Sequence, residues 1–155
     1  MVTGIEPSQP ITRTLQQKFD DFVSIRDFGA KGDGVTDDTV AINRALSELY
    51  TREVNAEIRR SLFFPAGIYK VTDTIKVPSY AKLYGEGAKS TTIKYFSPDG
   101  GATVAGAVVR TVDSKNQTGA NIGNFSATVP TDIEISNMGF ESANDLAASI
   151  INFYT

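Results

Sequence analysis

The feature that most constrains the fold is a run of short apolar segments that fills the chain from residue 62 onward. Each has three to six residues, most stop at proline, glycine or a polar turn, and no further helical pattern lies among them. Such strands are typical of a sandwich, a barrel or a β-solenoid. The segments are 62–64, 68–71, 75–77, 82–84, 92–96, 107–112, 133–138 and 150–153.

The alternation within these segments favours the solenoid. Residues 75–77 read Ile-Lys-Val and residues 133–135 read Ile-Glu-Ile, so each strand buries one side only. Residues 119–131 are polar and loop-like between two such strands. Long loops that leave a stack of short strands are characteristic of solenoids.

One amphipathic helix is expected before the strands. Its apolar positions follow the i, i+3, i+4, i+7, i+8 spacing of a broad helical face. We expect Thr36 or Asp37 to cap this helix, and Asp37 and Asp38 to interact favourably with its dipole in the first turn. The apolar positions are Ile42, Ala45, Leu46, Leu49 and Tyr50.

A second, narrower helical stripe lies near the N-terminus. Ile11, Leu15, Phe19 and Phe22 recur at spacings of four, four and three, just after Pro10. An isolated helix of about twelve residues is marginal in water. We therefore expect this arm to contact either the body of the protein or other copies of the chain.

The composition excludes several classes of site. The 155 residues include no His and no Cys, so this chain has no imidazole or thiolate zinc site, no disulfide and no His-dependent catalytic triad. The net charge of −3 argues against nucleic-acid binding, and no apolar run is long enough to span a membrane. Residues 1–7 lack the features of a secretory signal. We expect no cofactor, no metal and no catalytic residue in this segment.

The glycine-rich stretch 27–34 is predicted to be a tight, irregular turn. Gly29, Gly32 and Gly34 allow backbone angles that other residues avoid. A divalent-cation loop at Asp33, Asp37 and Asp38 is the alternative, but the stretch lacks the ligand spacing and distal Glu of a calcium loop. We therefore interpret it as a structural turn.

Other acidic and glycine-rich positions are also interpreted structurally. Residues 85–90 resemble a phosphate-binding loop only faintly, because a strand and not a helix is expected after them. A pair of carboxylates could serve glycoside hydrolysis, but the sequence brings no two of them together. The acidic residues considered are Glu86, Asp132, Glu134 and Glu141.

Several of these segments resemble the opening motif of pectate-lyase-superfamily right-handed β-helix proteins. Residues 23–39 read VSIRDFGAKGDGVTDDT, and residues 63–69 and 83–87 read FFPAGIY and LYGEG. Residues 133–140, which read IEISNMGF, resemble a later turn of the same fold. The resemblance implies a mainly β chain: a right-handed parallel β-helix with an N-terminal capping helix and a short helical arm. An uncovered solenoid end exposes core and strand edges, so the helix is expected to act as a lid.

Residues 11–22 running directly into the motif resemble bacteriophage tailspikes and tail fibres. That resemblance implies a homotrimer whose arm, through Ile11, Leu15, Phe19 and Phe22, contacts the three-fold axis or a phage tail or baseplate protein. It also implies a virion protein that is assembled in the host cytoplasm, with host surface polysaccharide bound by later turns. We expect an arm over residues 1–22, an opening motif and cap over 23–61, and the first turns over 62–155.

Three functions remain open at this point. The first is a structural attachment and capping region of a tail protein that mediates host adhesion. The second is a polysaccharide lyase or hydrolase whose catalytic turns lie beyond this segment, and the third is a fibre that binds sugar without turnover. Because residues 150–155 end within an apparent strand, we also expect either a longer natural chain or a partner that covers this end.

Overall fold

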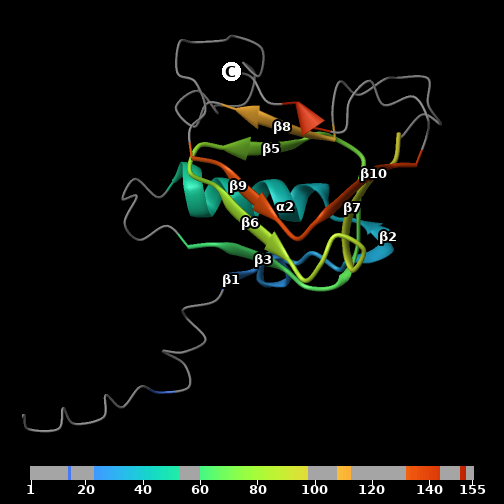
Figure 1. Cartoon of the computed structure of the whole chain (residues 1–155), viewed down its shortest axis with the longest axis horizontal. Helices are drawn as coiled ribbons and strands as arrows, with labels where there is room; N and C mark the ends of the chain where they lie inside the picture. The colour runs from blue at the N-terminus through green and yellow to red at the C-terminus, as the bar shows by residue number, and fades with distance from the viewer. Residues whose placement is uncertain are drawn as a thin grey trace, which may run out of the picture.

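The computed structural model describes residues 14, 23–52, 60–97, 108–112, 132–143 and 151–152. Over these residues the fold is a right-handed parallel β-helix, in which the strands form three parallel sheets (Figure 1). Each coil after the first adds one strand to each sheet in the same order, so neither a sandwich nor a barrel is formed. The predicted mainly β solenoid is therefore confirmed.

The three sheets are named A, B and C in the order in which the chain visits them. Sheet A contains β1 (Val23–Ser24), β3 (Leu62–Phe64), β6 (Lys82–Gly85) and β9 (Glu134–Ser136). Sheet B contains β2 (Asp33–Asp37), β4 (Gly67–Val71), β7 (Thr91–Tyr95) and β10 (Gly139–Ser142). Sheet C contains β5 (Ile75–Pro78), β8 (Val109–Val112) and β11 (Ile151–Asn152).

The first coil differs from the others because a helix takes the place of its third strand. A 3-10 turn, η1 (Ile25–Phe28), follows β1, and α2 (Thr39–Leu46) follows β2. The helix continues through a π-helical stretch, η2 (Ser47–Thr51). It lies against β5, the first strand of sheet C (Figure 1). No helix within the described residues has the length and hydropathy needed to cross a bilayer.

The parallel register places like residues above one another. Leu62 pairs with Leu83, and Leu83 pairs with Ile135, so one inward column of sheet A is aliphatic through three coils. The next column points outward, and there the rings of Phe63 and Tyr84 stack with centroids 4.9 Å apart. Strand alternation thus explains how each strand buries one side.

The coils contain very different numbers of residues, although their strands remain aligned. Leu62 and Leu83 are 21 positions apart in the sequence, whereas Leu83 and Ile135 are 52 positions apart. The additional residues lie between β7 and β8 and between β8 and β9. Both connections adjoin β8 of sheet C, so the length of the chain varies beside that sheet.

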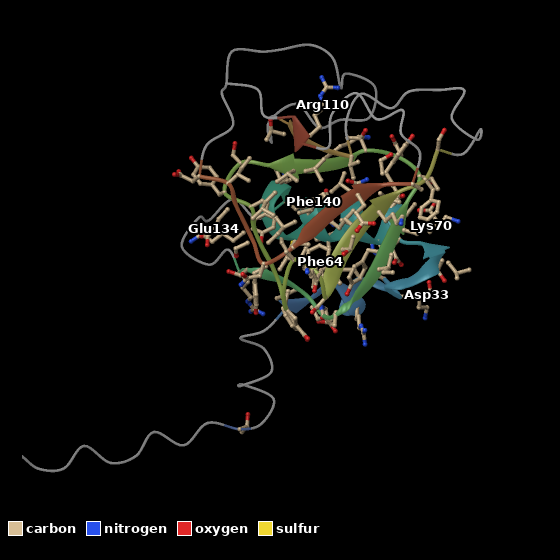
Figure 2. All side chains as sticks on the ribbon, turned by 45° about the vertical axis from the view of Figure 1, so that its right-hand side comes forward. Asp33, Phe64, Lys70, Arg110, Glu134 and Phe140 are labelled. Carbon is tan, nitrogen blue, oxygen red and sulfur yellow. The ribbon has the colours of Figure 1, made fainter. Side chains whose placement is uncertain are left out.

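The hydrophobic core lies between the three sheets and beneath α2. The ring of Phe64 meets that of Tyr69 edge to face, with centroids 5.4 Å apart, and both side chains are fully buried (Figure 2). The helix contributes Ile42, Ala45, Leu46 and Tyr50 to this core. The apolar face predicted for the helix is therefore confirmed at these four positions, and Leu49 is partly buried against the same cluster.

Two predicted local structures need correction. Part of the stretch predicted as an irregular turn is strand β2, which pairs with β4 through a register shift between Asp33 and Asp37. Tertiary pairing has overridden the turn preference of glycine and aspartate there. The single strand predicted over 133–138 ends at Ser136, because Asn137 adopts a φ of 55° and turns the chain into β10.

Candidate functional site: the glycine-rich loop and the helical cap

The glycine-rich loop uses left-handed backbone conformations at each of its three glycines. The φ angles are 96° at Gly29, 64° at Gly32 and 74° at Gly34. Gly32 is the most restricted, because a Cβ atom there would lie 3.0 Å from the ring of Tyr69. Its carbonyl accepts a hydrogen bond from the Ile68 amide at 3.0 Å, which joins the loop to sheet B. The loop is thus a close contact between the first and second coils.

Asp33 stabilises the turn that follows it. Its carboxylate accepts hydrogen bonds from the amides of Val35 and Thr36 at 2.9 and 2.8 Å, and from the Thr36 hydroxyl at 2.8 Å. The amide of Thr36, the amide of Val35 and the Thr36 hydroxyl together hold the pKa of Asp33 below its usual value. Thr36, expected as a helix cap, instead binds this carboxylate.

Asp37 connects the start of the helix to sheet B. Its carboxylate accepts from the Thr39 amide at 3.0 Å and from the hydroxyls of Thr39 and Thr72 at 2.5 Å each. Partial burial alone would raise the pKa of Asp37, but these hydrogen bonds and the charge of Lys70 outweigh it and lower the pKa. Asp37 therefore satisfies one amide of the first helical turn from outside the helix.

Asp38 occupies the N-cap position, but its side chain caps no helical amide. The residue is only 1% exposed, and its carboxylate accepts from the amides of Lys31 and Gly32 at 2.7 and 3.0 Å. The direction expected for this side chain therefore needs correction, since it holds the glycine-rich loop and not the helix. The physical reason is that the left-handed turn at Gly32 directs two adjacent amides toward it.

Polar side chains of α2 bind the exposed backbone edge of the second coil. Asn43 donates through Nδ2 to the Thr74 carbonyl at 3.3 Å and accepts through Oδ1 from the Lys76 amide at 3.0 Å. The Thr39 hydroxyl accepts from the Thr72 amide at 2.9 Å. These contacts could not be predicted from the sequence, because polar residues between apolar helix positions are ordinarily assigned to solvent.

Tyr50 connects the end of the helix to two coils. Its hydroxyl lies 2.7 Å from the Arg60 carbonyl and 2.9 Å from the Lys82 carbonyl, so its single proton is shared between two acceptors. Burial raises the pKa of Tyr50 from its usual 10 to about 12, although the hydrogen bonds partly oppose this. A phenol that remains protonated here acts as a donor and not as an acid.

The carboxylates of the loop are thus engaged by donors of the chain itself. Within the described part of the chain, no group of three or more acidic residues is arranged to hold a metal ion. The loop and the cap thereby connect the first coil to the second.

The other acidic residues considered in the sequence lie in separate places. Glu134 is exposed on β9 of sheet A, and Glu141 is exposed on β10 of sheet B, where it binds Lys94 at 3.1 Å. Asp132 is an exposed corner residue with a φ of 54°. Figure 2 shows Glu134 at the opposite side of the view from Asp33 and Lys70. The structure brings no two of these carboxylates together on one sheet face.

Two predicted features remain, the turn at residues 85–90 and the N-terminal arm. Glu86 is an exposed residue of the turn between β6 and β7, and a strand follows residues 85–90, as in a turn rather than a phosphate loop. The arm residues Ile11, Leu15, Phe19 and Phe22 lie outside the described residues, so their proposed contacts stay predictions.

A charged column on the outer face of sheet B was not foreseen from the sequence. Register places Asp37, Lys70, Lys94 and Glu141 in successive coils. The ammonium group of Lys70 also lies 5.3 Å from the centre of the Phe96 ring. Only the pairing register reveals this column, because neighbouring members are 24 to 47 positions apart in the sequence.

Comparison with known proteins connects this geometry to a family. A family model described as rhamnogalacturonase A/epimerase, pectate lyase-like, matches residues 22–150. A glucan 1,3-beta-glucosidase of Cochliobolus carbonum is 43% identical over 79 residues, which is 51% of this chain and 9% of the relative. The preneck appendage protein of Bacillus phage PZA is 35% identical over 78 residues, 50% of this chain and 8% of the relative.

A solved structure agrees with both the sequence and the fold. The ORF18 protein of Geobacillus virus E2 is 37% identical, with a TM-score of 0.51 over 63% of this chain and 18% of that one. The chain thus spans less than a fifth of the length of each of these proteins. Since the family model covers most of the sequence and the strands form the expected coils, the chain belongs to the rhamnogalacturonase A/epimerase, pectate lyase-like family.

Proposed function

We propose that this chain is a structural virion component, the attachment and capping region of a phage tailspike, tail fibre or related appendage that mediates host adhesion. The observation that carries the proposal is the 37% identity to a protein of Geobacillus virus E2 with the same fold. The identity to the PZA preneck appendage protein supports it independently.

The capped first coil fits such a role. The loop and the cap close one end of the solenoid through backbone and side-chain contacts, which is what an elongated fibre needs at its beginning. In this proposal residues 1–22 are the virion-attachment arm, residues 23–61 the opening motif and cap, and residues 62–155 the first coils. Three copies associate, a tail or baseplate protein receives the arm, and later coils bind host surface polysaccharide. Assembly takes place in the host cytoplasm.

Substitution of the arm stripe tests the attachment role. Leu15→Asp combined with Phe19→Asp removes the apolar contact, so incorporation into purified particles, measured by immunoblot, should fall at least about tenfold. Val35→Asp is the matched control, because Val35 is an apolar residue that is 76% exposed outside the arm. Unchanged incorporation of the double variant, with a normal far-UV circular dichroism spectrum, would contradict the attachment role.

The mass of the assembly tests the trimer separately. Sedimentation equilibrium of the 16.7 kDa chain should give about three times that mass at micromolar concentration. A monomer or dimer over the whole accessible concentration range would contradict the trimer while leaving the attachment test unaffected.

A polysaccharide depolymerase is the second function that an observation favours. The 43% identity to a glucan 1,3-beta-glucosidase supports carbohydrate chemistry in a longer protein that contains this fold. The test is release of reducing ends from β-1,3-glucan and from host capsule. We expect none from these 155 residues, because no two of the four residues weighed for glycoside hydrolysis, Glu86, Asp132, Glu134 and Glu141, share a sheet face. Turnover by this segment alone would favour the enzyme, whereas binding without turnover would favour a sugar-binding fibre.

A further inference from the structure

Without α2, the edge of β5 that faces the helix would be an unpaired sheet edge. The Ile75 amide donates to the Val108 carbonyl at 2.9 Å, which directs Ile75 toward the third coil. In a parallel strand the neighbouring residues direct their backbone groups to the opposite edge. The backbone groups of Thr74 and Lys76 therefore point toward the helix. If this edge were unpaired, it would accept a strand from another chain.

Asn43 fills one position of that edge. A side-chain amide carries the same donor and acceptor as a peptide group, and Asn43 uses both, one on Thr74 and one on Lys76. A single helical residue thereby makes the pair of contacts that one residue of a parallel strand would make. The apolar residues of the helix cover the core but supply no hydrogen-bonding group to this edge.

Backbone groups that precede Thr74 in the second coil also have hydrogen-bond partners at the start of the helix. The Asp38 amide donates to the Lys70 carbonyl at 2.8 Å, and the Thr39 hydroxyl binds the Thr72 amide. At the far end of β5 stands Pro78, which has no amide proton to offer. Four backbone groups of this stretch thus bind residues at the start of the helix, namely the carbonyls of Lys70 and Thr74 and the amides of Thr72 and Lys76.

We propose that Asn43 is a positioning residue that replaces a strand of sheet C and denies the edge of β5 to a second copy of this chain. The occupant that it excludes is a strand of identical sequence, because β5 already pairs in parallel with a similar strand, β8, on its other edge. The inference depends only on contacts between α2 and the second coil, so it holds whether or not the chain attaches to a virion.

The test is Asn43→Leu, which keeps the approximate size of the side chain and removes both hydrogen-bonding groups. Amide exchange at Lys76 should become about tenfold faster or more, while exchange at Ile75, which is bonded to β8, stays unchanged. Sedimentation velocity should show species larger than those of the unsubstituted chain, increasing with concentration. Val40→Leu is the matched control, because Val40 lies on the same helix and is 77% exposed.

A suppressor identifies the edge as the cause. Lys76→Pro removes the amide that faces the helix but none of the bonds to β8, so combined with Asn43→Leu it should restore the original size distribution. If Asn43→Leu fails to fold by circular dichroism, Asn43→Ala removes the same groups without adding bulk. Unchanged exchange at Lys76, no additional association, or association that persists with Lys76→Pro would each overturn the proposal.

Discussion

Successive coils approach each other closely at Gly67, and this predicts a large effect of one methyl group. A Cβ atom on Gly67 would lie 2.5 Å from the backbone carbonyl oxygen of Gly32, whereas ordinary contact begins near 3.4 Å. The two coils would have to separate locally by about 0.9 Å. The hydrogen bond from the Ile68 amide to that same oxygen is now 3.0 Å long, and this separation would break it.

The expected cost of Gly67→Ala is the sum of two effects. Inserting a methyl group at this tight contact costs about 1–3 kcal/mol, and loss of the partly exposed hydrogen bond costs about 0.5–1.5 kcal/mol more. We therefore expect the free energy of unfolding to fall by about 1.5–4.5 kcal/mol, a large share of the roughly 5–15 kcal/mol of a typical domain. Urea unfolding followed by circular dichroism and tyrosine fluorescence measures this difference.

Gly87→Ala is the matched control for this experiment. The Cβ atom at Gly87 would meet the Ser90 side chain at ordinary distances, 3.5 Å from the hydroxyl oxygen and 3.9 Å from the Cβ atom. Its effect should stay within about 0.5 kcal/mol. If Gly67→Ala and Gly87→Ala unfold at the same urea concentration with equal slopes, the coils are not held as closely as the geometry indicates, and the reasoning is wrong.

Three further predictions concern single side chains. Tyr50→Phe should lower the free energy of unfolding by about 0.5–1.5 kcal/mol at neutral pH, because two partly buried carbonyls lose their donor. Since the folded pKa of Tyr50 is raised to about 12, its contribution to stability is complete below pH 10 and is lost as the pH rises toward 12. The urea midpoints of the two proteins should therefore converge in that window. Midpoints that fall in parallel would contradict this. The folded pKa of Asp37 is lowered, so its contribution to stability is present above the unfolded pKa near 4 and is lost as the pH falls further. Asp37→Asn should therefore flatten the decrease of the thermal midpoint between about pH 5 and pH 2. Equal slopes for the two proteins would refute this role of Asp37. Lys94→Met breaks an ion pair with the exposed Glu141, so the change in unfolding free energy should stay below about 1 kcal/mol, and a larger loss would show that the charged column acts as a unit.

The sequence predicts the coils well because apolar and polar residues alternate along each short segment, and the same alternation separates buried from outward-facing side chains in the strands. Ile75 and Val77 are apolar on either side of Lys76, and in the structure they are buried while Lys76 faces outward between them. The broad apolar face of the helix likewise predicted the burial of Ile42 and Leu46. Both patterns depend on the separation of apolar from polar residues, which local periodicity records.

The contacts that join the coils could not be read in this way. Asn43 follows Ile42 in the helix, and nothing in the local pattern distinguishes it from a solvated residue until β5 is placed beneath it. The same holds for Asp38, which binds the loop behind it and not the helix ahead of it. Such roles depend on backbone groups brought close by the fold, and short-range propensity carries no information about them.

The unequal coils have a consequence for how proteins of this architecture change. Residues are added beside β8 without disturbing the alignment of the strands, so growth there does not alter the ladder that maintains the fold. Loop closure becomes only slowly more costly with length. Foreign peptides grafted at these two positions should therefore be tolerated, whereas a single residue inserted within β4 would turn its inward side chains toward solvent. One scaffold can thus vary in chain length on one flank while the opposite corners remain fixed.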